Sequence, residues 1–450
     1  MHAESVYIFR HALLRDSAYE MQLPSHRADL HGAAAVAMAQ LSLQAEFARE
    51  IAEHARLADS ATLHDIEAKH LEIAASYLSS RYQHAEELAC WLRLSEIQTG
   101  AERAESLANA AESASRLGEL SHAEQLYATA LVLFSDTGDA LGHARCMGNI
   151  GHIHKERGEL ALAEKSYRAG LQAFEELGDV GFIGVGQECL ATLYSVQRRI
   201  AEAEELYLEA LKNVREAGRT SSEATLLGNL GNLYLLGERR DEAEPHYLDA
   251  LQIARETGMR SLEGRTLGNL ATLRRFQGRV DEAEALYREA LNILHETGDR
   301  RGQGRALGDL AELLYNGSRH QEAEGQLREA LQTCREMGDL RGEGLALGRL
   351  ADMHERLGHD AEARHLYERS LPVQQAAGNL RAIGLVKCGL ARLYARAGDG
   401  KRARQFWQEG LAELESSGDK RNFAEQLARM GTVFKTAGVK APTNVPDTRI

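Results

Sequence analysis

A repeat of 40 residues runs without insertion from about residue 101 to residue 420, and it constrains the fold more than any other feature. Alanine returns every 40 residues from Ala123 to Ala403, leucine from Leu131 to Leu411, and glycine from Gly138 to Gly418. A further position is aromatic in seven of the eight copies, namely Tyr127, Tyr167, Tyr207, Tyr247, Tyr287, Tyr367 and Trp407. Such repeats stack so that each unit buries its apolar face on its neighbours, so we expect a solenoid of eight units over residues 101–420.

Each unit is predicted to form two helices. Within residues 261–300, apolar residues recur three and four positions apart, first up to Gly278 and then from about Asp281 to Gly298. This spacing places them on one helix face, and glycine tolerates the left-handed conformation that ends a helix. The predicted fold class is therefore all-α, an α-solenoid of antiparallel helix pairs. Other glycines recur inside the first helices, where they predict close contact between helices: Gly228, Gly268, Gly308 and Gly348.

The segment LGNLATLRRFQGRVDEAEALYREAL resembles the tetratricopeptide repeat, in the longer variety found in kinesin light chain and in cell-polarity adaptors. The resemblance covers residues 101–420, although the period of 40 exceeds the family's usual length of about 34. It implies a right-handed superhelix whose first helices line a concave groove. It also implies an interaction scaffold that binds a protein or peptide in that groove and has no chemistry of its own.

The two ends of the chain depart from the repeat. Residues 421–437 are predicted to form one more first helix that caps the last unit, with Phe423, Leu427, Met430 and Phe434 on its apolar face. The polar tail 438–450 contains two prolines and is predicted to be disordered. Residues 1–100 lack the period, and 67–95 are predicted to form a degenerate helix pair that caps the other end. A homo-oligomer through such end caps is compatible with the sequence.

The start of the chain carries a second resemblance. FRHALLRDSAYEMQLPSHRADLHGAAAVAM is similar to the region that follows the nucleotide-binding module in bacterial signalling ATPases of the STAND type. The matching positions are Phe9, His11, Ala18, Tyr19, Leu30 and His31. No phosphate-binding Walker A motif precedes them. This resemblance implies a sensory or autoinhibitory arm, either as a stand-alone descendant or as a fragment of a longer protein.

Charge and composition disfavour several kinds of partner. The formal net charge of −14 disfavours nucleic acid, and no apolar run is long enough to predict a membrane span. The cysteines lie far apart without a CxxC pair, which fits a reducing compartment, so we expect a cytoplasmic protein: Cys90, Cys146, Cys189, Cys334 and Cys388. No motif predicts a metal, a cofactor or catalysis, and His143, His152 and His154 are interpreted as solvated surface residues.

The tetratricopeptide resemblance places four positions of each first helix on the concave side. An asparagine amide there can pair with the backbone of an extended peptide whatever its side chains are. Arginines can receive acidic side chains or a terminal carboxylate, and an aromatic can hold an apolar side chain. The predicted groove residues are Asn149, Asn229, Asn232, Asn269, Arg265, Phe276, Arg305, Arg349, Arg356, Arg392 and Arg396. The alternative is that these positions are solvated and that the arginines pair with neighbouring acids.

Overall fold

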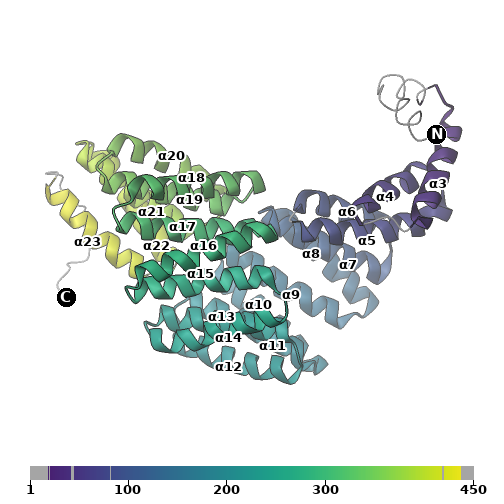
Figure 1. The fold of residues 1–450 in the computed structure, drawn as a ribbon, viewed down its shortest axis with the longest axis horizontal. Helices are drawn as coiled ribbons and strands as arrows, with labels where there is room; N and C mark the ends of the chain where they lie inside the picture. The colour runs from purple at the N-terminus through teal and green to yellow at the C-terminus, as the bar shows by residue number, and fades with distance from the viewer. Residues whose placement is uncertain (1–18, 20, 42–44, 82, 418–419, 437–450) are drawn as a thin grey trace. The chain divides into compact units, whose positions relative to one another are not determined.

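The computed structural model describes residues 19, 21–41, 45–81, 83–417 and 420–436. Within these ranges the chain consists of helices and the short turns that join them, with no strand (Figure 1). The predicted all-α solenoid of antiparallel helix pairs is confirmed. The helices group into two compact units, Met1–Gly142 and His143–Ile450, and each is described by itself.

The first unit contains α3, α4, α5, α6, α7 and α8, with two short 3-10 turns. The bounds are Pro24–Gln40, Ala48–Leu57, His64–Ser80, His84–Ile97, Gly100–Arg116 and Leu120–Thr137, with the turns at Ala45–Phe47 and Ala61–Leu63. Helices α5 and α6 cover the segment 67–95 and bury Leu71, Ala75 and Leu94 between them and α4. Of the residues that carry the second resemblance, Phe9, His11 and Ala18 lie outside the described residues, and Leu30 is 60% exposed.

The second unit alternates first and second helices in strict register. The first helices are α9 (Ala140–Glu156), α11 (Val180–Val196), α13 (Thr220–Leu236), α15 (Arg260–Phe276), α17 (Arg300–Asn316), α19 (Leu340–Arg356) and α21 (Leu380–Arg396). The second helices are α10 (Leu160–Leu177), α12 (Ile200–Glu216), α14 (Arg240–Glu256), α16 (Val280–Thr297), α18 (His320–Met337), α20 (Asp360–Ala376) and α22 (Gly400–Ser416). Each starts close to 40 residues after its counterpart, as the repeat predicts.

The recurring alanines and aromatics form the core of this stack. Ala203, Ala243 and Ala283 have no exposed surface, and Tyr247 and Tyr287 are equally buried. A small residue on a second helix lets the first helix approach, and the large ring fills the space beside it. At Gly231 this approach is so close that a side-chain carbon there would lie 2.5 Å from the Tyr247 ring. An alanine at this position would therefore push the ring out of the core.

Among the four recurring glycines for which the sequence predicted close helix contact, Gly228 and Gly268 do not have that role. A side-chain carbon at Gly228 or Gly268 would meet nothing within 4 Å, so close helix contact is wrong at these two positions. At Gly308 it would meet the guanidinium group of Arg349, a side chain of the next first helix, α19. Gly228 and Gly268 therefore leave room on their helices, whereas a side-chain carbon at Gly348 would lie at ordinary contact distance from Ser370 of α20 and Val386 of α21.

The last described helix, α23 (Lys420–Thr436), packs against α21 and α22. Met430 is fully buried, with Phe423 and Leu427 partly buried beside it, while Glu425 is exposed. The side chain of Phe434 and the predicted disordered tail 438–450 lie outside what the structure describes. The apolar side of α23 therefore continues the core of the stack beyond α22.

Candidate binding surface on the inner face of the second unit

The stack of the second unit curves until distant repeats meet. An ion pair joins Arg341 of α19 to Glu156 of α9, 185 residues earlier in the chain. Two turns approach beside it, since a side-chain carbon built on Gly158 would lie 3.5 Å from Leu380. One built on Gly378 would lie 3.6 Å from the Cα atom of Arg157. These contacts bring the two ends of the stack together. We use the term inner face for the groove positions that the tetratricopeptide resemblance assigns to the first helices α9 to α21.

The asparagines of the inner face fall into two groups. Within the described residues, the side-chain amides of Asn149 and Asn269 have no hydrogen-bond partner. In contrast, Asn229 donates to Glu188 Oε1 at 3.0 Å, and Asn232 accepts from the Tyr247 hydroxyl at 2.8 Å. The structure therefore leaves the first two amides free for a ligand and commits the other two to the fold.

The bond at Asn232 belongs to a series that the sequence did not predict. The hydroxyls of Tyr207, Tyr247 and Tyr287 pair with Thr192, Asn232 and Thr272, each 15 residues earlier and each at 2.8 Å. Burial raises the pKa of Tyr287 to about 12, so its phenol keeps its proton and its hydrogen bond. The sequence signal for this series of hydrogen bonds was a polar residue 15 positions before each core tyrosine. One of the four predicted groove positions thus also supports the core tyrosine of the same repeat.

Beside Asn229 the inner face holds a group of partly buried ionisable residues. Burial raises the pKa of the Glu188 carboxyl to about 7, although the Asn229 amide and Lys155 oppose the shift. Burial also lowers the pKa of the Lys155 ammonium and raises that of the Cys189 thiol to about 12. A thiol with so high a pKa is a poor nucleophile.

The arginines near the end of the stack are paired, as the alternative in the sequence analysis described. Arg392 is 3% exposed and makes two 2.7 Å bonds to the Glu355 carboxylate. Arg396 pairs with Asp360 and with Glu355, while Arg356 is exposed and pairs with Asp352 at 2.9 Å. We therefore do not include Arg392 in the surface that a ligand can reach.

The remaining groove residues are more accessible. Arg265 is exposed and lies 3.4 Å from Asp299. Phe276 is 45% exposed, and the guanidinium group of Arg275 lies 4.5 Å from the centre of its ring. Arg349 is exposed and pairs with Asp309 at 3.1 Å. Arg305 is also exposed and has no ion-pair partner among the described residues.

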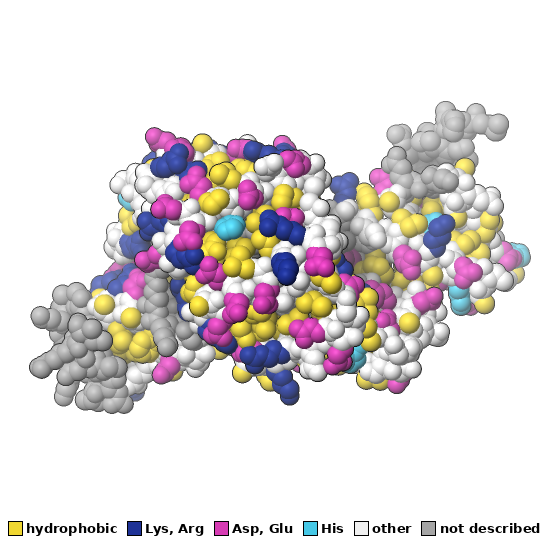
Figure 2. All heavy atoms as spheres, turned by 90° about the horizontal axis from the view of Figure 1, so that it is seen from below, with side chains coloured by type: hydrophobic (Ala, Val, Ile, Leu, Met, Phe, Trp, Pro, Cys, Tyr) yellow, Lys and Arg dark blue, Asp and Glu magenta, His cyan; other side chains and the backbone are white. Residues whose placement is uncertain are grey.

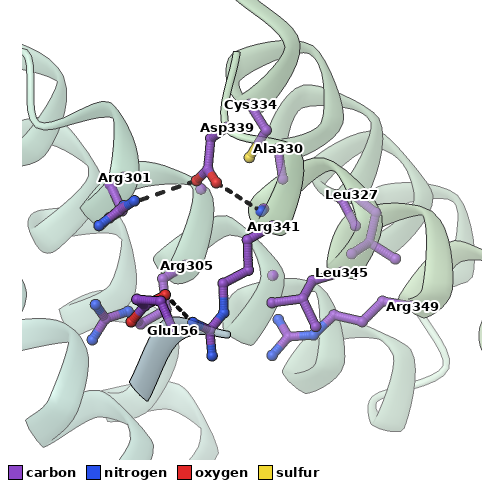
Figure 3. A pocket seen from close by; sticks show the side chains of 14 residues that line it. Glu156, Arg301, Arg305, Leu327, Ala330, Cys334, Asp339, Arg341, Leu345 and Arg349 are labelled. Carbon is purple, nitrogen blue, oxygen red and sulfur yellow. Dashed lines mark hydrogen bonds and ion pairs between the residues drawn. The ribbon is translucent and has the colours of Figure 1, made fainter. Parts of the chain in front are cut away.

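Arg305 and Arg349 line a cavity of about 270 Å³ together with two arginines that the sequence analysis missed, Arg301 and Arg341 (Figure 3). We call this cavity, with the four arginines and Glu156, the arginine pocket. Arg301 and Arg341 lie in the first turns of α17 and α19, outside the four groove positions. The available signal was their recurrence exactly one repeat apart. Elsewhere the charges are mixed, and Figure 2 shows acidic and basic side chains interspersed over one face.

Other functional classes have little support in the described part of the chain. No group of three or more histidine, cysteine or acidic side chains there could hold a metal ion. None of the described helices combines the length and the apolar character needed to cross a membrane.

Comparison with known proteins identifies the repeat. The model of the tetratricopeptide repeat family matches residues 183–256 and 262–336. The chain therefore contains tetratricopeptide repeats, and the resemblance inferred from its sequence is confirmed. No curated protein sequence matches it.

Several solved structures are similar in fold. A Rap protein complexed with competence and sporulation factor is 13% identical, with a TM-score of 0.51 over 80% of this chain and 99% of that chain. Aspartyl phosphate phosphatase F from Bacillus subtilis is 12% identical, with a TM-score of 0.48 over 76% of this chain and 91% of that one. At these identities the likeness concerns the fold alone.

A signal transduction ATPase with numerous domains and a tetratricopeptide repeat sensor, from Pyrococcus horikoshii, is 15% identical with a TM-score of 0.47. The similarity covers 70% of this chain and 50% of that chain. The present chain thus spans half the length of that ATPase.

Proposed function

We propose that the chain binds a protein or an extended peptide along the inner face of its second unit. The observation that supports this most directly is the pair of free amides, Asn149 and Asn269. An amide offers both a donor and an acceptor, so each can hold the backbone of a peptide in two directions. The exposed ring of Phe276 adds an apolar contact near Asn269 in the same helix.

Interaction scaffolding is also what tetratricopeptide repeats generally do, and the inner face offers no competing chemistry. Its thiol has a raised pKa, and its carboxylates pair with arginines or asparagines. A binding function needs only complementary contacts, which a row of variable side chains on an invariant core supplies. We therefore propose a non-enzymatic role.

The test starts with affinity capture by the full chain from its native cell extract, followed by mass spectrometry and titration of the purified partner. Replacing both amides, Asn149→Ala with Asn269→Ala, is expected to weaken binding about tenfold to a hundredfold, since each removes a hydrogen bond. The matched control is Asn292→Ala, an exposed asparagine on the second helix α16. Equal affinities for the double variant and the control would refute binding through the free amides.

A second candidate function is that of a sensory or autoinhibitory arm for a signalling ATPase of the STAND type. The structure adds one observation to the resemblance at the start of the chain. The Tyr19 hydroxyl lies 2.8 Å from His31 Nε2, and His31 Nδ1 lies 2.7 Å from His54 Nδ1, which links α3 to α4. If this is the function, the full chain should capture a nucleotide-binding signalling protein, and His31→Ala should abolish the capture while leaving the inner face intact.

A further inference from the structure

The arginine pocket is bounded by α17, α18 and α19, and Glu156 reaches it from α9. Its walls include the apolar side chains Leu327, Ala330 and Leu345. Figure 3 shows Arg341 and Arg305 beside Glu156, whereas Arg301 is directed to Asp339. The pocket thus combines a charged side with an apolar one.

The positive charge of the pocket is only partly balanced. Four arginines line it, against two acids, Glu156 and Asp339, in a chain whose formal net charge is −14. Arg301 lies 4.0 Å from Asp339, which also accepts a hydrogen bond from the backbone of Gly342 at 3.0 Å. Arg305 has no ion-pair partner among the residues that the structure describes. The guanidinium group of Arg305 is therefore available to a further anion, and that of Arg301 is held only at 4.0 Å from its partner.

Glu156 supplies the one carboxylate that comes from a distant repeat. Burial opposes its charge, but the charges of Arg341 and of the neighbouring basic groups together outweigh that effect, so the pKa of Glu156 is lowered. The carboxylate is consequently ionised when it meets Arg341. Glu156 is a charged carboxylate on a flexible side chain, and it pairs with an arginine 185 residues away in the chain. An acidic ligand would bind that arginine through the same kind of contact.

We propose that the arginine pocket binds a carboxylate side chain of an acidic peptide, and that Glu156 occupies its place until the peptide arrives. This proposal rests on the proposed peptide-binding function and specifies its ligand. Guanidinium groups hold carboxylate and phosphate alike, but the apolar wall favours a peptide, whose neighbouring side chains can cover Leu327 and Leu345. Arg305 also lies on the inner face, one repeat after Arg265, so a peptide held at Asn269 can extend into the pocket.

Replacement of Glu156 by the ligand removes a contact within the stack. When the ligand takes Arg341, Glu156 leaves it, and the ion pair between α9 and α19 is lost. Glu156 therefore competes with the ligand, whereas Arg305 only assists it. Removal of these two side chains should change affinity in opposite directions, which a purely structural ion pair would not do.

The experiment titrates the full chain with fluorescein-labelled hexaglutamate and follows fluorescence anisotropy at low salt. Glu156→Gln is expected to tighten binding about tenfold, because the internal competitor loses its charge. Arg305→Gln is expected to weaken it about tenfold, because one charge-assisted contact is lost. The control is Arg328→Gln, which replaces an exposed arginine on α18 that does not line the pocket. Circular dichroism checks that each variant is folded.

The expected pattern is tighter binding for Glu156→Gln, weaker binding for Arg305→Gln and no change for Arg328→Gln. The proposal is overturned if Glu156→Gln weakens binding or matches the control, if labelled hexaglutamine binds as well as hexaglutamate, or if no variant binds the probe. Displacement of the probe by inorganic phosphate at equal affinity would also overturn it in favour of a small-anion site. Since the asparagine test uses a different partner and different residues, the two proposals can fail separately.

Discussion

Two glutamates on first helices of the second unit, Glu188 and Glu355, are both shielded from water, but their interaction partners differ. Glu188 of α11 has an asparagine as its hydrogen-bond partner and Lys155 nearby, and burial raises its pKa to about 7. Glu355 of α19 is 8% exposed, but it holds Arg392 by two bonds and also contacts Arg396. Burial opposes its charge as well, yet these arginines hold its pKa below the usual range.

The comparison shows that position in the repeat does not decide the state of a carboxyl group. Desolvation acts on both, but only a guanidinium partner reverses its effect. The end of the inner face near α19 and α21 is consequently held by a buried ion pair. The part from α11 to α16 is held by hydrogen bonds to uncharged amide and hydroxyl groups. The former should be sensitive to loss of a partner, and the latter to pH.

The largest expected effect follows from removing a member of the buried pair. Arg392→Ala leaves the buried carboxylate of Glu355 with Arg396 as its one remaining cationic partner among the described residues and should lower the free energy of unfolding by about 3–5 kcal/mol. Its matched control is Asn232→Ala at the equivalent repeat position, which removes only the partner of Tyr247 and should cost about 1–2 kcal/mol. Urea denaturation followed by circular dichroism measures both. Similar losses would remove the distinction between the two regions.

The pH dependence should have opposite signs at the two glutamates. The pKa of Glu188 rises from 4.5 to about 7 on folding, so the folded state binds more protons and its stability falls as pH rises through that window. The free energy of unfolding should fall by up to about 3 kcal/mol over this window, and Glu188→Gln should not show this loss. The depressed pKa of Glu355 should instead remove stability as pH falls below about 4.5, an effect that Glu355→Gln should lack. Denaturation midpoints at pH 3 to 8 test both signs, and a slope for Glu188→Gln equal to that of the parent chain would contradict the assignment.

A third prediction concerns the core between α19 and α20. Gln374 is fully buried, and neither polar atom of its amide has a hydrogen-bond partner in the described residues. The same repeat position holds Leu294 and Leu414, which face Gly264 and Gly384 as Gln374 faces Gly344. Gln374→Leu should therefore stabilise the chain by about 1–3 kcal/mol, measured by the shift of the thermal midpoint. The converse change, Leu294→Gln, is the matched test and should destabilise it, whereas loss of stability in both variants would mean that Gln374 has partners in solution.

The smallest expected effect belongs to the neutral bonds of the other region. Thr272→Val keeps the shape of the side chain but removes the hydroxyl that pairs with Tyr287, and it should cost about 1 kcal/mol. Thr225→Val serves as a control, because that hydroxyl bonds only to the backbone of Ser221 at an exposed site. Hydrogen exchange of α15 and α16 would locate the loss, and equal protection in the two variants would show that the tyrosine bond contributes nothing.

The sequence by itself determined the helix pairs and the core. Both the helix pairs and the core depend on contacts within one repeat or between adjacent repeats. Such contacts select the same residue types at a fixed period, for example the alanine at Ala283 and the aromatic at Tyr287. The resemblance to tetratricopeptide repeats, and not the periodicity, predicted that the asparagines lie on the inner face. It could not show that Asn149 and Asn269 stay free while Asn229 and Asn232 are engaged, since their partners come from other helices.

Tertiary structure alone decided which distant residues meet. Small rotations between successive repeats add up over the stack, and their sum brings Glu156 to Arg341 across 185 residues. No periodic signal records such a sum, so the sequence analysis missed Arg301 and Arg341 as pocket residues. The fate of Arg392 was decided in the same way, because its burial requires Glu355 and Gln426 to close over it from two other helices. The local sequence pattern determines the helices of a solenoid, whereas the summed rotations between repeats determine which distant residues form its sites.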